Sequence, residues 1–137
     1  MPGAESKLSE ALDLVWDPQM QDWDLTNANP DLLHRLVGIL TSPATSADEC
    51  FSAMCLAVAS YDELLLDRAN DVTLWSSLTE QLIRHPELYA SIVWYWAQPV
   101  VLGEEEPFPV SPAMEIIWKQ VKDQLRSSTR ADASRVS

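Results

Sequence analysis

The sequence predicts an all-α fold: a single compact domain of about six helices, with orthogonal or bundle-like packing and no repeat of fixed period. Three observations lead to this fold class. Leucine and alanine form long runs while glycine occurs only 3 times, a balance that favours helices over strands and turns. Apolar side chains recur at helical spacing in successive segments. Several of these segments begin with a helix-capping residue or with a proline in the first helical position.

Two helices are predicted in the first forty residues. The first is limited by Pro18, and its apolar stripe consists of Leu8, Ala11, Leu12 and Val15. The polar segment 17–29 (DPQMQDWDLTNAN) is expected to form a turn or a single helical turn. The second helix begins with Asn29 as its N-cap and Pro30 in the first helical position. Its buried face is predicted to contain Leu32, Leu33, Leu36, Val37 and Leu40.

Four further helices follow, and 127–137 is a polar tail that we expect to be disordered, so the helical domain covers 1–126. The next helix begins at the capping box of Ser46 with Glu49. The sequence leaves open whether this helix breaks near Ser60–Asp62. The helix after it begins at Asp71. The last two begin at prolines; one runs from Pro86 to about Ala97 and the other starts at Ser111-Pro112. Only PVVLG, between them, carries a faint strand signal. The residues expected to face inward are Phe51, Met54, Cys55, Val58, Leu65, Leu74, Trp75, Leu78, Leu82, Met114, Trp118, Val121 and Leu125.

The chain is strongly acidic, with 21 acidic and 9 basic residues and a net charge of −12. From Met1 to Val110 there are 18 acidic and 4 basic residues, net −14, whereas residues 111–137 hold 3 and 5, net +2. A body this acidic repels nucleic acid and anionic membranes and attracts basic proteins. We therefore expect a basic protein partner, no nucleic acid and no membrane, although solubility alone would also explain the charge.

The sequence also bears on the compartment. No stretch approaches the ~18 uninterrupted apolar residues of a membrane span. The N-terminus MPGAESKLSE lacks the basic and then apolar regions of a secretory signal, so a cytoplasmic protein is expected. Cys50 and Cys55 are five residues apart on one predicted helix, which holds their α-carbons beyond the ~7 Å limit for a disulfide. Both are expected to be free thiols.

Signatures of catalysis and of metal binding are missing from the sequence. It contains no glycine-rich phosphate loop, no HExxH, no CxxC pair and no nucleophile elbow. The two histidines, His34 and His85, have no partner at a spacing that suggests chemistry, and we interpret both as structural. We therefore expect a protein that is not an enzyme and that needs neither a cofactor nor a metal.

The segment GEEEPFPV, residues 103–110, is the first candidate binding site. Its prolines favour an extended form, which would hold the carboxylates of Glu104, Glu105 and Glu106 away from the body. Three adjacent carboxylates without another ligand make a poor ion cage, so they suit a lysine or arginine of another protein better. A solvated loop with Phe108 tucked beneath it is the simpler alternative.

Trp94 is the second candidate, because it lies off the apolar stripe of its own helix. With Ile92 placed at zero on a helical projection, Trp96 falls within about 60° of it and Trp94 near about 200°. Trp96 is therefore predicted to be in the core. Trp94 must either be covered by a second surface, from the last helix or the loop after Gln98, or face outward, where tryptophan favours interface centres.

Two weaker candidates remain. Trp23 between Asp22 and Asp24 would form a patch able to receive a basic side chain by charge and by cation–π contact, or else a helix-flanking staple. The last helix has a basic flank of Lys119, Lys122 and Arg126 at helical spacing. Those bases are expected to complement the helix dipole or to pair with the acidic body.

These features favour a non-enzymatic binding protein whose acidic surface captures a basic protein. Its most concrete form would be an immunity or antitoxin-like inhibitor of a cationic toxin or nuclease, by analogy of charge, size and fold class. The alternative is a helical adaptor or assembly subunit that docks through an apolar surface marked by Trp94 and Phe108. A small helical enzyme that uses scattered carboxylates is a third, weaker hypothesis. The partner, the biological source and the oligomeric state are left open.

Overall fold

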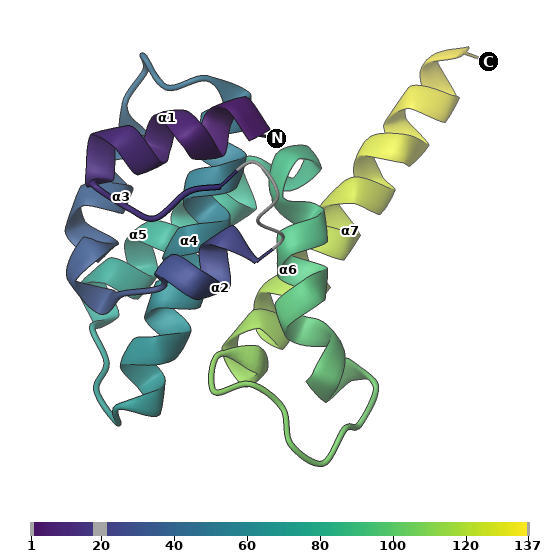
Figure 1. The fold of residues 1–137 in the computed structure, drawn as a ribbon. Coiled ribbons are helices and arrows are strands. Elements are labelled where there is room, and N and C mark those ends of the chain that lie inside the picture. Colours follow the sequence, from purple (N-terminus) through teal and green to yellow (C-terminus); the bar gives the residue numbers. More distant parts are fainter. Residues whose placement is uncertain (1, 18–21, 137) are drawn as a thin grey trace. The chain divides into compact units, whose positions relative to one another are not determined.

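The structure, a computed structural model, describes residues 2–17 and 22–136, and the side chains of 3–17 and 22–127. Within these ranges the chain forms seven α-helices and one short 3-10 helix, without a strand (Figure 1). The predicted all-α fold class is confirmed. The chain divides into two compact units, Met1–Leu78 and Thr79–Ser137, called unit 1 and unit 2 below. The domain boundary predicted at residue 126 is not tested by this division and stays a prediction.

The helices are divided between the two units. Unit 1 contains α1 (Pro2–Leu12), α2 (Trp23–Asn27), the 3-10 helix η1 (Pro30–Leu32), α3 (Leu33–Thr41), α4 (Ala47–Leu66) and the first part of α5 (Val72–Arg84). Unit 2 contains the rest of α5, then α6 (Pro86–Val101) and α7 (Ser111–Val136). None of the helices in the described part of the chain is both long enough and apolar enough to cross a membrane.

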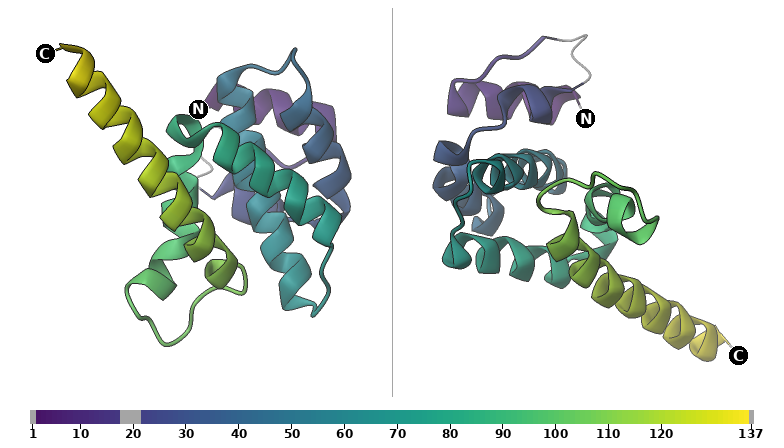
Figure 2. Two further views of the ribbon diagram at one scale, coloured as in Figure 1. Left: turned by 180° about the vertical axis from the view of Figure 1, so that it is seen from behind. Right: turned by 90° about the horizontal axis from the view of Figure 1, so that it is seen from below.

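α4 is the core helix of unit 1. Its middle turns are apolar or small on every side, and a helix of that composition is stable only when it is enclosed. Helices α1, α2, η1 and α3 all pack against it, as the ribbon shows (Figure 1 and Figure 2). The helix runs without the break that the sequence left open near Ser60–Asp62. Its buried residues are Ser52, Ala53, Met54, Leu56, Ala57, Val58, Ala59, Ser60, Tyr61 and Asp62.

Three of the predicted helix starts, at Asn29, Ser46 and Asp71, are confirmed by side-chain caps. The Asn29 side chain accepts from the Asp31 N–H at 3.0 Å, although the first turn it caps is 3-10 rather than α. Ser46 Oγ accepts from the Glu49 N–H at 3.2 Å at the start of α4. Asp71 Oδ1 accepts from the Leu74 N–H at 3.0 Å at the start of α5. These bonds satisfy backbone donors that the first turn of a helix leaves unpaired.

The first helix ends earlier than predicted. α1 stops at Leu12 because Asp13 adopts a positive φ of 57°. Two of the four residues expected on the apolar stripe, Ala11 and Val15, are instead exposed, Val15 to 63%. The backbone of Val15 is held by the side chain of Asn27, which accepts from the Val15 N–H at 3.0 Å and donates to the Val15 carbonyl at 2.9 Å. The stripe prediction was wrong at Val15 because backbone bonding, not side-chain burial, fixes this residue.

In unit 2, α6 and α7 pack along one another as a hairpin. α6 continues beyond Ala97 through Pro99 to Val101, so the faint strand signal of PVVLG was wrong. The helix ends in a Schellman motif: Gly103 has φ 73°, and the Gly103 and Glu104 N–H groups donate to the carbonyls of Val100 (3.1 Å) and Pro99 (2.7 Å). Glycine suits that left-handed position because it has no β-carbon.

α7 extends to Val136 and therefore covers most of the segment 127–137, where the sequence predicts a disordered polar tail. The backbone of residues 127–136 is helical in the structure, which differs from that expectation. Residue 137 lies outside the described residues. A helix with few apolar residues in its last turns has little packing to stabilise it, which is why composition alone predicted disorder.

A buried hydrogen bond between Trp23 and Ser9 gives a stability prediction for the core of unit 1. Trp23 Nε1 donates to Ser9 Oγ at 2.7 Å, and both residues are buried. We expect Trp23→Phe to lower the free energy of unfolding by about 1–3 kcal/mol, since it leaves a buried hydroxyl without its donor. Urea denaturation measures this, and the double variant with Ser9→Ala should lose less than the sum of the two single changes. Leu25→Ala, at a 45% exposed position, is the control and should change stability by less than about 0.5 kcal/mol. An unfolding curve of Trp23→Phe that overlays the parent would contradict the assignment.

Candidate functional site

The acidic charge of the chain falls mainly on unit 1. Residues 1–78 hold 13 acidic and 3 basic residues, net −10, whereas residues 79–137 hold 8 and 6, net −2. The described side chains of unit 1 form one ion pair, in which Lys7 Nζ lies 3.2 Å from Glu49 Oε1. Arg35 donates to the backbone carbonyl of Ala11 at 3.1 Å rather than to a carboxylate. With 3 basic residues against 13 acidic ones, most of the negative charge of unit 1 has no positive counterpart within the unit.

The expected patch of Asp22, Trp23 and Asp24 does not form on the surface. Trp23 is only 2% exposed, because its indole lies in the core and bonds to Ser9. Asp22 is exposed and Asp24 is half-buried. Trp23 therefore offers no ring face to a basic side chain, and the staple-like alternative describes it better. Periodicity could not show this, because α2 has only five residues, too few to define a buried face.

Asp24 belongs instead to a half-buried group with Glu5 and Cys55. Burial raises the pKa of Asp24, and the negative charge of Asp22 raises it further, although backbone N–H groups of Asp24 and Leu25 oppose the shift. Burial also raises the pKa of Glu5, with a smaller contribution from the charge of Asp24. Burial raises the pKa of the Cys55 thiol to about 12, with the two carboxylates adding to it. This environment disfavours a reactive thiolate.

The remaining titratable candidates from the sequence are two cysteines and two histidines. Neither Cys50 nor Cys55 forms a disulfide, as predicted. His34 is exposed on α3. His85 precedes α6 without a side-chain cap; its carbonyl accepts from the Leu88 and Tyr89 N–H groups, each at 3.2 Å. No group of three or more His, Cys, Asp or Glu in the described chain could hold a metal ion.

Trp94 is covered by its own chain. Its ring lies against that of Trp118 on α7, with centroids 5.1 Å apart and planes tilted by 46°. Both tryptophans are half-buried. Trp96, two residues further on, is buried as predicted. The off-stripe tryptophan therefore lies between α6 and α7, where it helps to hold the hairpin together, and part of it reaches solvent.

Phe108 anchors the loop between α6 and α7. Its ring meets Trp96 edge-on at 4.9 Å and stacks on Tyr95 at 6.1 Å. Phe108 remains 37% exposed, whereas Val110 at the end of the loop is fully buried. This packing agrees with the simpler alternative given above, a solvated loop with Phe108 tucked beneath it. Glu104, Glu105 and Glu106 are nevertheless exposed, so the loop also presents three carboxylates as expected.

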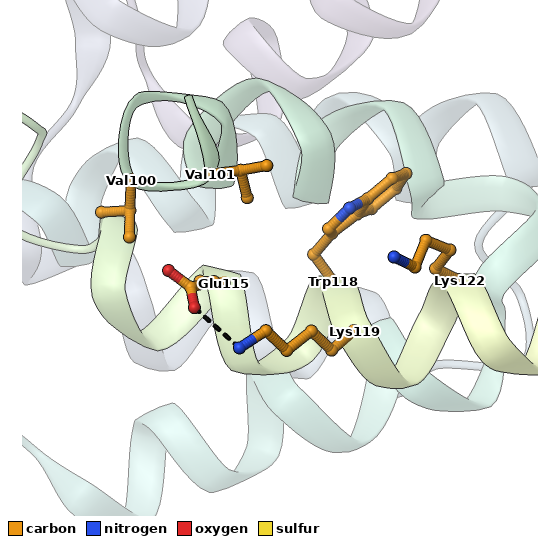
Figure 3. Close-up of a pocket in the computed structure, with 6 residues that line it drawn as sticks. All are labelled: Val100, Val101, Glu115, Trp118, Lys119 and Lys122. Carbon is orange, nitrogen blue, oxygen red and sulfur yellow. Dashed lines mark ion pairs between the residues drawn. The ribbon is translucent and has the colours of Figure 1, made fainter. Parts of the chain in front are cut away.

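A shallow groove in unit 2 was not foreseen from the sequence. It has a volume of about 230 Å³ and lies between the last turn of α6 and the first turns of α7 (Figure 3). The Lys119 ammonium lies 2.9 Å from Glu115 Oε1, and the Lys122 side chain extends toward Trp118 (Figure 3). Two residues of the basic flank of α7, Lys119 and Lys122, thus line a groove with an apolar wall. The residues that line it are Val100, Val101, Glu115, Trp118, Lys119 and Lys122.

The ring contact between Trp94 and Trp118 gives a stability prediction. Trp94→Ala and Trp118→Ala should each destabilise the chain, by less than the ~3–5 kcal/mol of a fully buried tryptophan because both are half-buried. A double-mutant cycle by thermal or urea unfolding should show a coupling of about 0.5–1.5 kcal/mol. Ile116→Ala, at a 70% exposed position on α7, is the control. Strictly additive single effects would show that the two rings do not stabilise one another.

The raised pKa of Asp24 gives a pH-dependent prediction. Since its folded pKa lies above the unfolded value, the protonated carboxyl favours folding below the unfolded pKa. That contribution is lost as the pH rises through the folded pKa. Asp24→Asn should therefore raise the free energy of unfolding at neutral pH, and the gain should shrink in acid. Glu10→Gln, which removes one exposed charge from α1, is the control, and urea unfolding at several pH values measures both. An Asp24→Asn variant less stable than the parent at neutral pH would be the opposite result.

Comparison with models of protein families, with curated proteins and with solved structures found no match for this chain. Its function is therefore inferred from its own charges, exposed side chains and groove.

Proposed function

We propose that this chain is a non-enzymatic binding protein whose acidic surface captures a basic protein. The observation that carries the proposal is the net charge of −10 on unit 1, where the described side chains contain one ion pair. Uncompensated surface charge of one sign attracts a partner of the opposite sign and accelerates its association. In its most concrete form, the partner is a cationic toxin or nuclease, and the chain is an immunity or antitoxin-like inhibitor that covers its cationic cleft.

The carboxylates of unit 1 are available for this role. Glu63 and Asp67 are one helical turn apart at the C-terminal end of α4, so they lie on the same face of the helix and are both exposed. Negative charge at a helix C-terminus is unfavourable for the helix dipole, and neither residue forms an ion pair among the described side chains. Other exposed carboxylates of unit 1 include Glu10, Asp13, Asp22, Asp31 and Asp48.

A second candidate function is that of an adaptor or assembly subunit which docks through an apolar surface. The observation in its favour is a set of exposed apolar side chains in unit 2. Trp94 contributes little to that surface because Trp118 covers much of it. Capture by charge weakens steeply with salt, while apolar docking does not. The exposed apolar residues of unit 2 are Tyr95, Val101, Leu102, Phe108 and Ile116.

Charge reversal in two matched pairs tests the proposal. Glu63→Lys with Asp67→Lys changes unit 1 by four charges without opposing its helix dipole, and Glu104→Lys with Glu105→Lys makes the same change in the exposed loop of unit 2. Each variant is used to capture proteins from the native lysate at low and at high salt. Mass spectrometry identifies a candidate partner, and stopped-flow mixing then measures its association rate.

The expected partner is basic, and the parent should lose it as salt rises. The unit 1 pair should slow its association, by roughly tenfold at low salt, and flatten the salt dependence. If the loop pair has the larger effect, the carboxylates 104–106 carry the capture instead. A partner that binds both variants at the parent rate, with no dependence on salt, would refute capture by charge and favour apolar docking.

A further inference from the structure

Two surfaces of opposite charge lie on the same hairpin of unit 2. The groove carries Lys119 and Lys122, and the loop 104–108 carries three exposed carboxylates followed by Phe108. Only residues 102 and 103 separate the end of the groove at Val101 from the beginning of that loop. We propose that a second copy of this chain docks here, with the loop 104–108 of each copy lying against the groove of the other in a two-fold symmetric dimer.

The size of the groove favours a protein segment as its occupant. Pockets that enclose small molecules usually measure ~300–1,000 Å³ and bury most of the ligand. This groove holds about 230 Å³ and is only partly enclosed. That space suits one or two side chains laid across it.

The charges of the groove select an acidic segment. Lys119 is paired with Glu115 at 2.9 Å, whereas Lys122 has no ion pair among the described side chains. Its side chain extends toward Trp118 (Figure 3). The valines and Trp118 form the apolar wall, so the complementary segment combines a carboxylate with an apolar neighbour. This chain contains such a segment at Glu106-Pro107, beside the anchored Phe108.

The loop is held ready for such a contact. At one end the Schellman motif fixes Glu104, whose N–H donates to the Pro99 carbonyl at 2.7 Å. At the other end the ring of Phe108 rests on Trp96 and Tyr95. A segment anchored at both ends loses little conformational freedom on binding. The carboxylates therefore reach a second copy at a low entropic cost.

The surroundings also favour self-association at unit 2. Its net charge of −2 makes it the less repulsive part of a chain whose unit 1 carries −10. Val101, which lines the groove, and the neighbouring Leu102 are 43% and 62% exposed, and the contact would bury part of that apolar surface. Since groove and loop are neighbours on one hairpin, a two-fold axis can bring each against its counterpart, as isologous dimers require.

The test is a charge swap followed by analytical ultracentrifugation. One variant has an acidic groove (Lys119→Glu with Lys122→Glu), and the other has a basic loop (Glu104→Lys, Glu105→Lys and Glu106→Lys). The first lowers the net charge of the chain to −16 and the second raises it to −6, from −12. General repulsion would therefore weaken self-association of the first variant and strengthen that of the second. The proposed contact instead places like charges together in both.

We expect the parent to dimerise, each variant alone to dimerise at least roughly tenfold more weakly, and an equimolar mixture of the two to form a heterodimer again. Arg35→Glu with Arg68→Glu also gives −16 but lies in unit 1, so it controls for total charge and should leave the dimer nearly unchanged. Far-ultraviolet circular dichroism confirms that each variant is helical.

Three results would overturn the proposal. The parent could sediment as a monomer at every concentration, the basic-loop variant could dimerise more strongly than the parent, or the mixed variants could fail to associate. If the parent is monomeric and a synthetic Glu-Glu-Glu-Pro-Phe peptide binds the groove, the occupant is an acidic segment of another protein. The test needs no basic partner, so its result does not depend on the proposed capture function.

Discussion

Two helices of this chain are apolar over more than one face, and that constraint determines how its two units are built. A helix with apolar residues all round must be enclosed. In unit 1 the helix is α4, which lies among α1, α2, η1 and α3. In unit 2 it is α6, whose two tryptophans are met on different sides by Trp118 of α7 and by Phe108 of the loop. The elements around both helices follow from the need to cover them.

In unit 2 the contacts that cover α6 also form the two candidate binding features, the groove and the acidic loop. Trp118 covers Trp94 and also forms the wall of the groove. Phe108 covers Trp96 and thereby holds the end of the loop that exposes Glu104, Glu105 and Glu106. A groove and a charged loop therefore arise from the packing of one hairpin. Function on such a surface would depend on stability, because loosening the ring contacts would also loosen the binding surface.

The two units differ in net charge, and each charge suits a different kind of recognition. Unit 1 holds most of the negative charge with few internal pairs, which suits long-range attraction of a basic partner. Unit 2 is nearly balanced and exposes apolar side chains beside lysines and carboxylates, which suits short-range contact with a matched surface. Asp24 and Glu5 show the cost of placing charge near the core, since burial raises the pKa of both.

The sequence by itself determined the helical class, the caps at Asn29, Ser46 and Asp71, the free thiols and the total charge. These depend on local spacing, on bonds within one turn or on composition. The tertiary structure decided what required knowledge of neighbours. In the tertiary structure Trp23 is buried against Ser9, α1 ends at Leu12, and Trp118 packs against Trp94. Helical periodicity tells which residues share a face but not which element meets that face, and a groove between two helices exists only once that partner is known.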